Sequence, residues 1–477
     1  MKTTYDIVKE IRCNTFVAGG GVAGSSAAIA SARGGAKTIL CEMGGTLGGQ
    51  AGIGLVTPLS SVTSKSRIPF GGLVKEIVDE TSRLTEKYVI DDESFGTAYN
   101  ISPHILKYVL LKMASDAGVN VRFHTVLCDA ETENGRIKSV IIKDKSGYTR
   151  VIADTYIDAT GDADLVYLSE DNYVLGSESG IYDKLMGANL DKVHSDGGKS
   201  EKYHSDNLMQ PVSLFFVMRG VDYEKASSLN NKNLYFGDLG ITKERFEKWE
   251  FCGTPGFEIQ SDFVPMPQNR VLMTRGRHSD EAVINMSRVI NINGADGDDL
   301  SRGEVICQLQ LIAIVDFLKT FIPGFEKSYL VESSSRLGVR ETRRLVGKYK
   351  LSGLDLINGS SFPDTVACGY YMIDIHDPQG KRNAIGGDLE MDYFEIPYRS
   401  LCSEKYNNLL VCGRCISCDH IAHSATRIQG CCITTGNAVG VASALTAKEG
   451  IAPCDLSPDS LRESLKKDGI FVGNNKK

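Results

Sequence analysis

Short apolar runs alternate with polar and glycine-rich segments near the start of the chain and predict a strand–helix–strand unit. Residues 16–18, Phe-Val-Ala, form an apolar run typical of a buried parallel strand, and the Ala-rich segment 22–33 predicts a helix. Residues 38–41, Thr-Ile-Leu-Cys, predict a second strand. Residues 1–14 lack such a run and are interpreted as a short extension before the first strand.

Apolar periodicity predicts further elements along the chain. Residues 102–117 begin with Ser-Pro and carry apolar residues at helical spacing, so they predict a helix. The Asn134-Gly135 pair lies between two alternating segments and predicts a β-hairpin. Residues 304–322 predict a long amphipathic helix that Pro323 stops.

Three glycines follow the first strand in G-x-G-x-x-G spacing, and an acidic residue ends the second strand. In a dinucleotide site the first glycine permits the tight turn, the second lets the backbone approach the pyrophosphate, and the third lets helix and strand pack closely. The helix N-terminus presents free N–H groups to the phosphates, and the acid accepts the ribose hydroxyl hydrogens. We therefore expect dinucleotide contacts from Gly19, Gly21, Val22, Ala23, Gly24, Glu42 and Met43.

A second glycine-rich turn, GGTLGGQAG at 44–52, comes directly after Glu42. The first motif alone does not separate NAD from FAD. A second turn in this place lets another backbone segment lie along a longer, extended cofactor, and so it favours FAD. Further contacts are expected from Leu47, Gly48, Gly49 and Gln50.

With this turn the sequence resembles the FAD-dependent oxidoreductases of the glutathione-reductase-like class, and more narrowly a bacterial family that reads GG-x-LGG-x-A here. Fumarate-reductase-type and heterodisulfide-reductase-A-like flavoproteins are related to it. The resemblance covers nearly the whole chain. It implies FAD as cofactor and an α/β fold: a discontinuous Rossmann-like FAD-binding domain of the glutathione-reductase type, with an inserted α+β substrate domain. We place the first FAD-binding part at 1–175, the inserted domain at 176–394 and the C-terminal FAD-binding part at 395–477.

The resemblance also implies cofactor contacts later in the chain. The segment ATGDAD at 159–164 returns beside the cofactor, and a last parallel strand at 409–411 is followed by a Gly-Arg turn. A helix is predicted at 433–445, and its positive N-terminal end is expected to face the N1–C2 edge of the flavin. The additional candidates are Val126, Thr160, Gly161, Asp162, Gly413, Arg414, Thr434, Thr435, Gly436 and Asn437.

Candidate catalytic residues come from three segments that match the family pattern. His420, His423 and Arg427 follow the last strand, and one of the two histidines is expected to take the proton that accompanies hydride loss. His423 is the first choice because it is nearer the following helix, although satisfied histidines in a packed loop are the alternative. Arg427 is expected to hold a carboxylate or enolate oxygen of the substrate.

Arg340 and His376 complete the candidates. Arg340 lies in the segment GVRETRR at 338–344, which predicts a site for an anion; a solvated basic turn paired with Glu341 is the alternative. His376 lies in Asp-Ile-His-Asp at 374–377, where flanking carboxylates are expected to raise its pKa. A structural histidine is the alternative there.

Cys412, Cys415 and Cys418 have the C-x2-C-x2-C spacing of some iron–sulfur sites. Against a cluster, Cys412 falls inside an apolar strand, where it is expected to be a small buried residue. His420 and His423 lack convincing third and fourth ligands for zinc. The sequence therefore predicts no metal.

Composition limits the class of protein. The chain has 477 residues, a net charge of −7, 42% hydrophobic and 24% charged residues, and 13 cysteines. The acidic balance argues against nucleic acid as a partner, no apolar stretch approaches the roughly 18 residues of a membrane span, and no signal peptide is recognised. We expect a cytoplasmic enzyme with reduced thiols, a small-molecule substrate and no membrane partner; a homo-oligomer is compatible with the sequence.

These observations predict an FAD-dependent oxidoreductase that transfers a hydride between flavin N5 and a small polar organic substrate. The substrate, the direction of transfer and the electron donor or acceptor are left open. One alternative is an electron-transfer subunit that carries FAD and an iron–sulfur cluster. A tRNA-modifying flavoprotein is the other, and the acidic balance counts against it.

Overall fold

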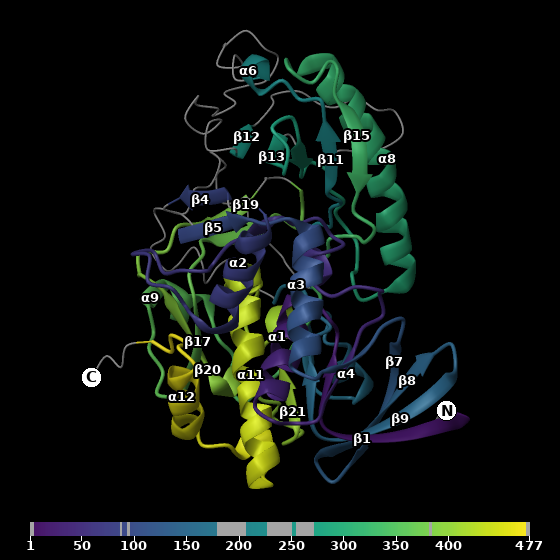
Figure 1. The fold of residues 1–477 in the computed structure, drawn as a ribbon, viewed down its shortest axis with the longest axis vertical. Helices are drawn as coiled ribbons and strands as arrows, with labels where there is room; N and C mark the ends of the chain where they lie inside the picture. Colours follow the sequence, from purple (N-terminus) through teal and green to yellow (C-terminus); the bar gives the residue numbers. More distant parts are fainter. Residues whose placement is uncertain are drawn as a thin grey trace.

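A computed structural model describes residues 4–85, 88–92, 96–178, 207–226, 250–253, 271–380 and 384–473. Within these residues the fold belongs to the mixed α/β class and is built on one large sheet (Figure 1). The strands of this sheet are β1 (Ile7–Ala18), β2 (Thr38–Cys41), β6 (Asn120–Arg122), β7 (Val126–Glu133), β8 (Arg136–Asp144), β9 (Gly147–Asp158) and β21 (Leu409–Val411).

Five strands of the large sheet run parallel in the order β6, β2, β1, β9 and β21. β8 and β7 continue the sheet in antiparallel fashion from the first part of β9. The last residues of β1, β9 and β21 (Ala18, Asp158 and Val411) lie in one register. The turns that follow these strands therefore meet at one edge of the sheet, which is where open α/β sheets bind ligands.

Two helices from opposite ends of the sequence pack together beside this sheet, α1 (Val22–Arg33) and α11 (Gln429–Glu449) (Figure 1). Two glycines of α11 allow the close approach. A Cβ atom on Gly436 would lie 2.2 Å from the carbonyl oxygen of Ala23, and one on Gly440 would lie 2.3 Å from that of Ala27. Any larger residue at either position would push the helices apart.

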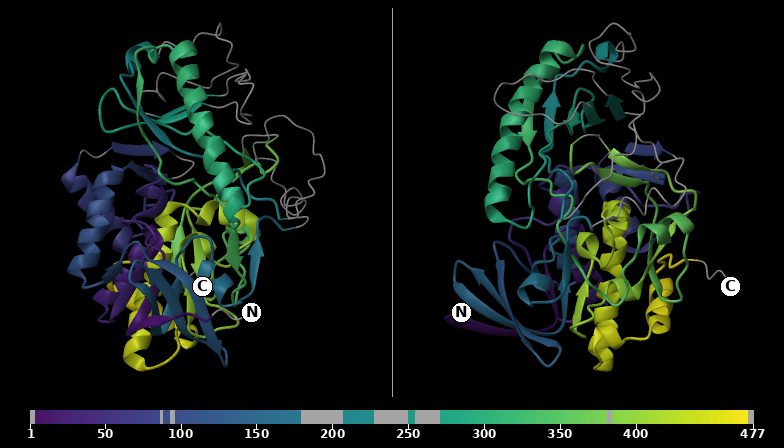
Figure 2. Two further views of the ribbon diagram at one scale, coloured as in Figure 1. Left: turned by 90° about the vertical axis from the view of Figure 1, so that its right-hand side faces the viewer. Right: turned by 180° about the vertical axis from the view of Figure 1, so that it is seen from behind.

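A second sheet has the strand order β12, β13, β14, β11, β15, and α8 accompanies it. Figures 1 and 2 show this unit at one end of the molecule, with α11 in the other part. Its own apolar cluster uses residues from Val212 to Leu337, whereas Leu345 and Ile396 belong to the cluster around the large sheet. The bounds are β11 (Phe216–Arg219), β12 (Glu250–Gly253), β13 (Val271–Arg275), β14 (Ala282–Ile284), β15 (Tyr329–Ser333) and α8 (Gly297–Phe321).

Smaller elements connect and cover these two sheets. The remaining strands of the described residues form four small sheets: β3–β5–β4, β10–β16, β17–β20 and β18–β19. Their bounds are β3 (Pro58–Leu59), β4 (Tyr88–Asp92), β5 (Gly96–Asn100), β10 (Tyr173–Leu175), β16 (Arg343–Leu345), β17 (Thr365–Gly369), β18 (Ile373–His376), β19 (Ala384–Gly387) and β20 (Phe394–Pro397). The helices are α2 (Gly72–Leu84), α3 (Pro103–Asp116), α4 (Asp164–Leu168), α6 (Tyr223–Ala226), α9 (Gly353–Asn358), α10 (His420–Thr426) and α12 (Pro458–Lys467), with short 3-10 turns η1 (Gly49–Ala51), η3 (Tyr398–Ser400), η4 (Gly413–Cys415) and η5 (Pro453–Asp455).

Several sequence predictions agree with these elements. The α/β class with a parallel sheet and the helix at 22–33 are confirmed. α3 lies within the predicted 102–117, and Asn134 and Gly135 form the hairpin turn between β7 and β8 with φ of 51° and 70°. The division into domains at 175 and 394 stays a prediction, and residues 179–206, within the predicted insertion, lie outside the described part. Among the described residues, no helix is both long and apolar enough to cross a bilayer.

Two predicted element starts are wrong. Residues 7–14 are not an extension but the first part of β1, paired with β9. They escaped detection because Lys9, Glu10 and Arg12 are exposed and interrupt any apolar run. The long helix α8 begins at Gly297 instead of 304, because the side chain of Asp296 accepts hydrogen bonds from two N–H groups of a polar first turn.

Candidate functional site

The first glycine turn has the geometry that close packing and ligand approach require. Gly19 has φ of +95°, and a Cβ there would lie 2.6 Å from the carbonyl oxygen of Ala159. A Cβ on Gly24 would lie 1.9 Å from the carbonyl oxygen of Gly19, so this glycine lets α1 pack against the turn. A Cβ on Gly21 would meet nothing within 4 Å. The second glycine of the motif therefore faces open space, where a phosphate can approach the backbone.

Glu42 connects the two glycine-rich turns. Its side chain accepts hydrogen bonds of 2.7 Å from the backbone N–H groups of Gly20 and Gly44. Met43 and Val126 lie close to it in the fold, since the backbone N–H of Thr125 donates to the carbonyl oxygen of Glu42. These two apolar side chains are 57% and 48% exposed, a suitable surface for a flat aromatic base.

The second glycine turn lies directly against the first. The N–H of Gly48 donates to the carbonyl oxygen of Gly20 at 2.9 Å, and both Gly48 and Gly49 have positive φ. Leu47 is fully buried beneath Gly20. Gln50 donates to the carbonyl oxygen of Leu337 at 2.9 Å, while its Oε1 is buried without a hydrogen-bond partner.

The turns after β9 and β21 are joined by an ion pair. Asp162 Oδ1 accepts from Arg414 Nη2 at 2.7 Å, and Arg414 Nη1 is buried without a partner. The turn at Thr160 and Gly161 is held by the fully buried Asp158, which accepts from Thr160 N and Oγ1. The predicted return of residues 159–162 to the glycine turn is confirmed, because Ala159 contacts Gly19.

The helix that was predicted to start at Ile433 starts at Gln429. The predicted start is wrong because Gly430 and two cysteines do not give the usual signals of a helix N-terminus. Residues 434–437 therefore lie in the second and third turns, where Thr435 accepts from Gly413 N–H and Asn437 accepts from an N–H of α2. Gln429, not Ile433, is the first residue of the helix. Its side-chain N–H donates to the carbonyl oxygen of Val56, and its Oε1 is buried without a partner.

His420 and His423 are both fully buried on α10 but have different surroundings. Nδ1 of His420 lies 2.7 Å from Glu341 Oε1. Neither ring nitrogen of His423 has a hydrogen-bond partner. Burial, opposed by Glu341 and reinforced by Arg344 and other arginines, lowers the pKa of His423 well below its usual value. His423 is therefore neutral and able to accept a proton.

Glu341 and Arg344 form a sealed ion pair behind His420. Both side chains are fully buried and hydrogen-bonded to each other, and Arg344 also pairs with Glu178 at 3.3 Å. Burial opposes ionisation of Glu341, but His420 and Arg344 hold its pKa well below its usual value. The alternative for this segment is a solvated basic turn paired with Glu341. The pairing is confirmed for Arg344, but solvation is wrong, since Arg343 is buried as well, against Asp162 and Asp164.

Arg340, His376 and Arg427 gather at a different carboxylate, that of Asp374. Arg427 Nη2 lies 3.2 Å from Asp374 Oδ2, and His376 Nε2 lies 3.4 Å from the same atom. The prediction of a raised pKa for His376 is wrong: burial and then the charge of Arg340 lower it to about 3, although Asp374 opposes the change. Arg340 donates to the carbonyl oxygen of Pro211 at 2.6 Å.

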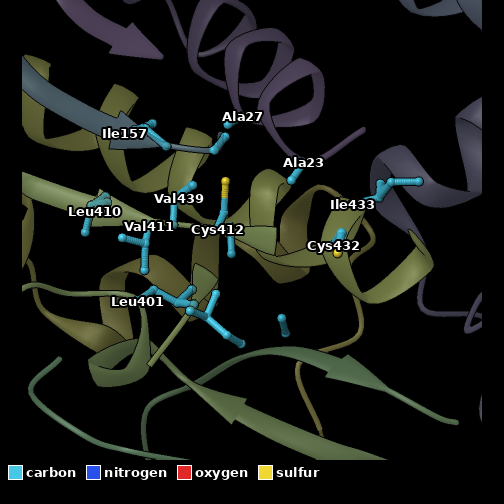
Figure 3. Packing of buried hydrophobic residues seen from close by; sticks show 14 of the residues in the cluster. Ala23, Ala27, Ile157, Leu401, Leu410, Val411, Cys412, Cys432, Ile433 and Val439 are labelled. Atoms are coloured by element: carbon cyan, nitrogen blue, oxygen red, sulfur yellow. The ribbon is translucent and has the colours of Figure 1, made fainter. Parts of the chain in front are cut away.

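The cysteines of the C-x2-C-x2-C run are buried thiols. Figure 3 shows Cys412 among apolar side chains between the last strand and the two packed helices. Burial raises the pKa of Cys418 to about 12 and that of Cys412 and Cys415 well above the usual value. Within the part of the chain that the structure describes, no group of three or more His, Cys, Asp or Glu side chains is arranged to hold a metal.

The sequence matches a known family over most of its length. A family model described as FAD dependent oxidoreductase matches residues 15–465. The chain belongs to this family. No curated protein matches its sequence.

Solved structures resemble this flavoprotein over most of its length at low identity. A geranylgeranyl bacteriochlorophyll reductase-like protein from Thermoplasma acidophilum is 15% identical, with 97% of this chain and 84% of that chain covered and a TM-score of 0.47. The flavin-dependent brominase Bmp2 is 10% identical, with 95% and 84% covered and a TM-score of 0.45. The myxobacterial chondrochloren halogenase CndH is 10% identical, with 96% and 78% covered and a TM-score of 0.44.

The flavoprotein uses FAD, and its buried polar atoms fit this cofactor. Some of the buried side-chain atoms that have no hydrogen-bond partner within the described residues lie on the segments that follow the edge of the large sheet, and others, such as Ser400 Oγ, lie elsewhere. Those on the segments that follow the edge are Gln50 Oε1, Arg414 Nη1, His423 Nδ1 and Nε2, Arg427 Nε and Gln429 Oε1. Gly21 leaves open space at the phosphate end, and Met43 and Val126 offer an apolar surface at the base end. The individual contacts to FAD stay predictions.

Sequence reasoning missed several residues of the site. Gln429 was missed because the helix start was misplaced. Gln210, which accepts from His376 N–H at 3.1 Å and lies 3.4 Å from Glu341, carries no motif. Glu178 comes at the end of a polar segment and gave no signal, although it accepts from the N–H of His420 at 3.0 Å.

Proposed function

We propose that this flavoprotein transfers a hydride between FAD and a small polar organic substrate, with His423 as the group that takes or returns the accompanying proton. When bound, FAD accepts or donates a hydride at N5. The protein then has to bind the substrate, exclude water and move one proton. His423, Arg427 and Arg340 are the side chains to which we assign these tasks.

The state of His423 is the observation that carries the proposal. Its ring is fully buried and neutral, and both nitrogens lack a partner. An unsatisfied buried polar group costs about 1–3 kcal/mol, so a side chain in this state calls for a partner that arrives later. A substrate hydroxyl or amine meets that need, and the neutral imidazole takes its proton.

Arg414 and Arg427 both lie near enough to His423 to influence its ring. Both guanidinium charges act on its ring and contribute to its low pKa. Arg414 is fixed by Asp162 at the cofactor turn, whereas Arg427 follows His423 by one turn of α10, with Arg427 N donating to His423 O at 3.0 Å. An arginine of the cofactor turn and the arginine that we assign to the substrate thus both act on this histidine, which supports its assignment as the proton acceptor.

The first turn of α11 supports the same assignment. It contains no acidic residue, and its N-terminal dipole carries partial positive charge. Negative charge that develops beside Gln429 and Gly430 is therefore stabilised by the helix itself.

The test is anaerobic flavin reduction by a panel of small polar organic compounds, followed by loss of the oxidised-flavin absorbance band. For a compound that reduces the wild type, His423→Gln should slow reduction by about 100- to 10,000-fold, the usual loss for a general base. FAD content should stay unchanged. His104→Gln is a matched control, since His104 is 43% exposed and contacts only Glu332 among carboxylates, at 3.4 Å. Reduction of the His423→Gln variant at the wild-type rate would remove His423 from the mechanism.

A further inference from the structure

The guanidinium groups of Arg427 and Arg340 both act on the carboxylate of Asp374 in β18, and Arg427 is the one that hydrogen-bonds to it. Arg427 Nη2 donates to the side chain and the backbone of Asp374, at 3.2 and 3.1 Å. Arg340 has only the carbonyl oxygen of Pro211 as a hydrogen-bond acceptor within the described ranges, and no ion pair there. Burial and then the charges of Arg427 and Arg288 lower the pKa of Arg340 to about 9. Arg340 and Arg427 together therefore carry one positive charge more than Asp374 compensates.

His376 does not change the net charge of this cluster. His376 lies 3.4 Å from Asp374 Oδ2, and with a pKa of about 3 it is neutral near pH 7. Its contact therefore orients the Asp374 carboxylate without adding charge. Burial opposes ionisation of Asp374, yet His376 and the two arginines hold its pKa well below the usual value.

The cluster is enclosed but partly exposed to solvent. The side chains of Arg427, Asp374 and His376 are 13%, 19% and 22% exposed. By contrast, Glu341, Arg344 and His420 of the neighbouring ion-pair network are 0% exposed. The first group is thus partly exposed to solvent, whereas the second is closed, as the ring of His423 also is. Arg427 Nε remains a buried donor without a partner.

We propose that Arg340 and Arg427 bind the carboxylate of the substrate, so that the substrate is a small organic monocarboxylate. This inference rests on the proposed function, because it names the substrate class of the same site. A guanidinium group offers a planar pair of donors that matches a carboxylate. The surplus of positive charge, to which Arg288 adds, calls for an anion, and a planar carboxylate matches the planar donors better than a tetrahedral phosphate does.

The position of Arg427 connects this anion site to the proton acceptor. His423 and Arg427 come from adjacent turns of α10. The proton-accepting side chain thus lies in α10 and the carboxylate-binding side chain belongs to the residue that caps the same helix, with the N–H of Arg427 bonded to the carbonyl oxygen of His423. A rigid support of this kind is what a catalytic pair needs.

Binding can be tested on the FAD-loaded protein with propionate and its uncharged analogue propionamide. Propionate should perturb the visible flavin spectrum on titration, and it should bind at least 10-fold more tightly than propionamide. Arg340→Gln and Arg427→Gln should each weaken propionate by about 10-fold or more and leave propionamide unchanged. Arg302→Gln, on the exposed face of α8, is the matched control and should bind as the wild type does. Equal affinities for the acid and the amide, or tighter binding of inorganic phosphate than of propionate, would overturn the proposal.

Two further measurements keep the result interpretable. Arg427→Lys retains the charge but not the planar fork, so it should bind propionate between the wild type and Arg427→Gln, with FAD content as the check on folding. Reduction of the flavin by uncharged compounds only, with His423→Gln impaired, would overturn the carboxylate site and leave the proposed function intact. If propionate binding depends on both arginines but His423→Gln is fully active, the role of His423 would be overturned and the carboxylate site would stand.

Discussion

His420 and His423 lie on the same face of one short helix and are equally buried, yet they do different work. His420 is bonded to Glu341, which is bonded to Arg344, and every member of that chain is closed to solvent. His423 has no partner on either nitrogen. The same residue type, one turn apart, is thus fully satisfied in one case and unsatisfied in the other.

This difference separates buried polar groups that stabilise the fold from those that we expect to bind FAD or substrate. Satisfied buried charges hold elements together, here α10, β16 and the segment at Glu178. Unsatisfied buried polar atoms are costly, and those of Arg414, His423 and Gln429 lie on segments that follow the edge where we expect FAD and substrate. The comparison supports a positioning role for His420 and the proposed proton-accepting role for His423. Substitutions at Glu341 and at His423 test the two roles separately.

A substitution in the fully buried network of Glu341, Arg344 and His420 should have the largest effect on stability. Glu341→Ala leaves Arg344 buried and short of a partner, and breaking a buried pair in this way typically costs about 3–5 kcal/mol. The free energy of unfolding, measured by denaturant titration, should fall by about that amount. A loss below about 1 kcal/mol would show that the Glu341 network is not a structural one.

The pH dependence of the free energy of unfolding should give the next largest effect, and it should distinguish His423 from Glu341. The folded pKa of His423 lies below the unfolded value of about 6.5, so the unfolded state binds more protons and stability falls as pH drops below about 6.5, by up to about 1.4 kcal/mol per pH unit. Glu341 has a lowered pKa, so its contribution is lost only below its unfolded value of 4.5. Unfolding at pH 7.0 and at pH 5.5 measures the difference. The decline should be smaller in His423→Leu; an unchanged slope would show that His423 is not buried neutral.

A smaller effect is expected from His423→Leu in the FAD-free protein at pH 7. The substitution removes two unsatisfied nitrogen atoms and keeps most of the side-chain volume, so the free energy of unfolding should rise by about 1 kcal/mol. Thermal unfolding of the FAD-free variant and of FAD-free wild type measures this change. A clear loss of stability would mean that the His423 ring makes favourable contacts that outweigh its unsatisfied atoms.

The smallest effect should come from the cysteines near this region. Cys412→Ala and Cys418→Ala should leave FAD content and flavin reduction unchanged, because both thiols are buried and protonated. Metal analysis of the pure protein alongside the flavin spectrum is the measurement. Stoichiometric iron that disappears in either variant would favour the electron-transfer alternative. The region around His423 would then hold an iron–sulfur cluster in addition to FAD.

Local signals in the sequence were sufficient where one segment determines its own structure. The helix at 22–33 has glycines before it, small residues along it and a glycine after it, and it was located at both ends. The start of α11 was not, since its first turn has neither a capping side chain nor an acid. The first part of β1 was missed because its strand pairing, not its apolar content, makes it a strand.

Partners that come from distant segments could not be predicted in this way. The sequence identified Arg340, His376, His420 and His423 as a set, but not which carboxylate each one meets. Glu341 lies next to Arg340 in sequence and yet pairs with His420 and Arg344. The sign of the pKa shift at His376 was wrong for the same reason: flanking carboxylates are visible in the sequence, whereas burial and an arginine from another loop are not.

The contact of Gly436 with Ala23 and of Gly440 with Ala27 has a consequence for biosynthesis. The helix that follows the G-x-G-x-x-G turn leaves the ribosome long before α11 exists, so its buried small-residue face waits without a partner for some 400 residues. At about 5–20 residues per second, that wait lasts roughly 20–80 s. The nascent chain thus carries the complete first glycine motif while it still lacks α11, the helix that packs against α1, so this arrangement is assembled only after residue 449 has been made.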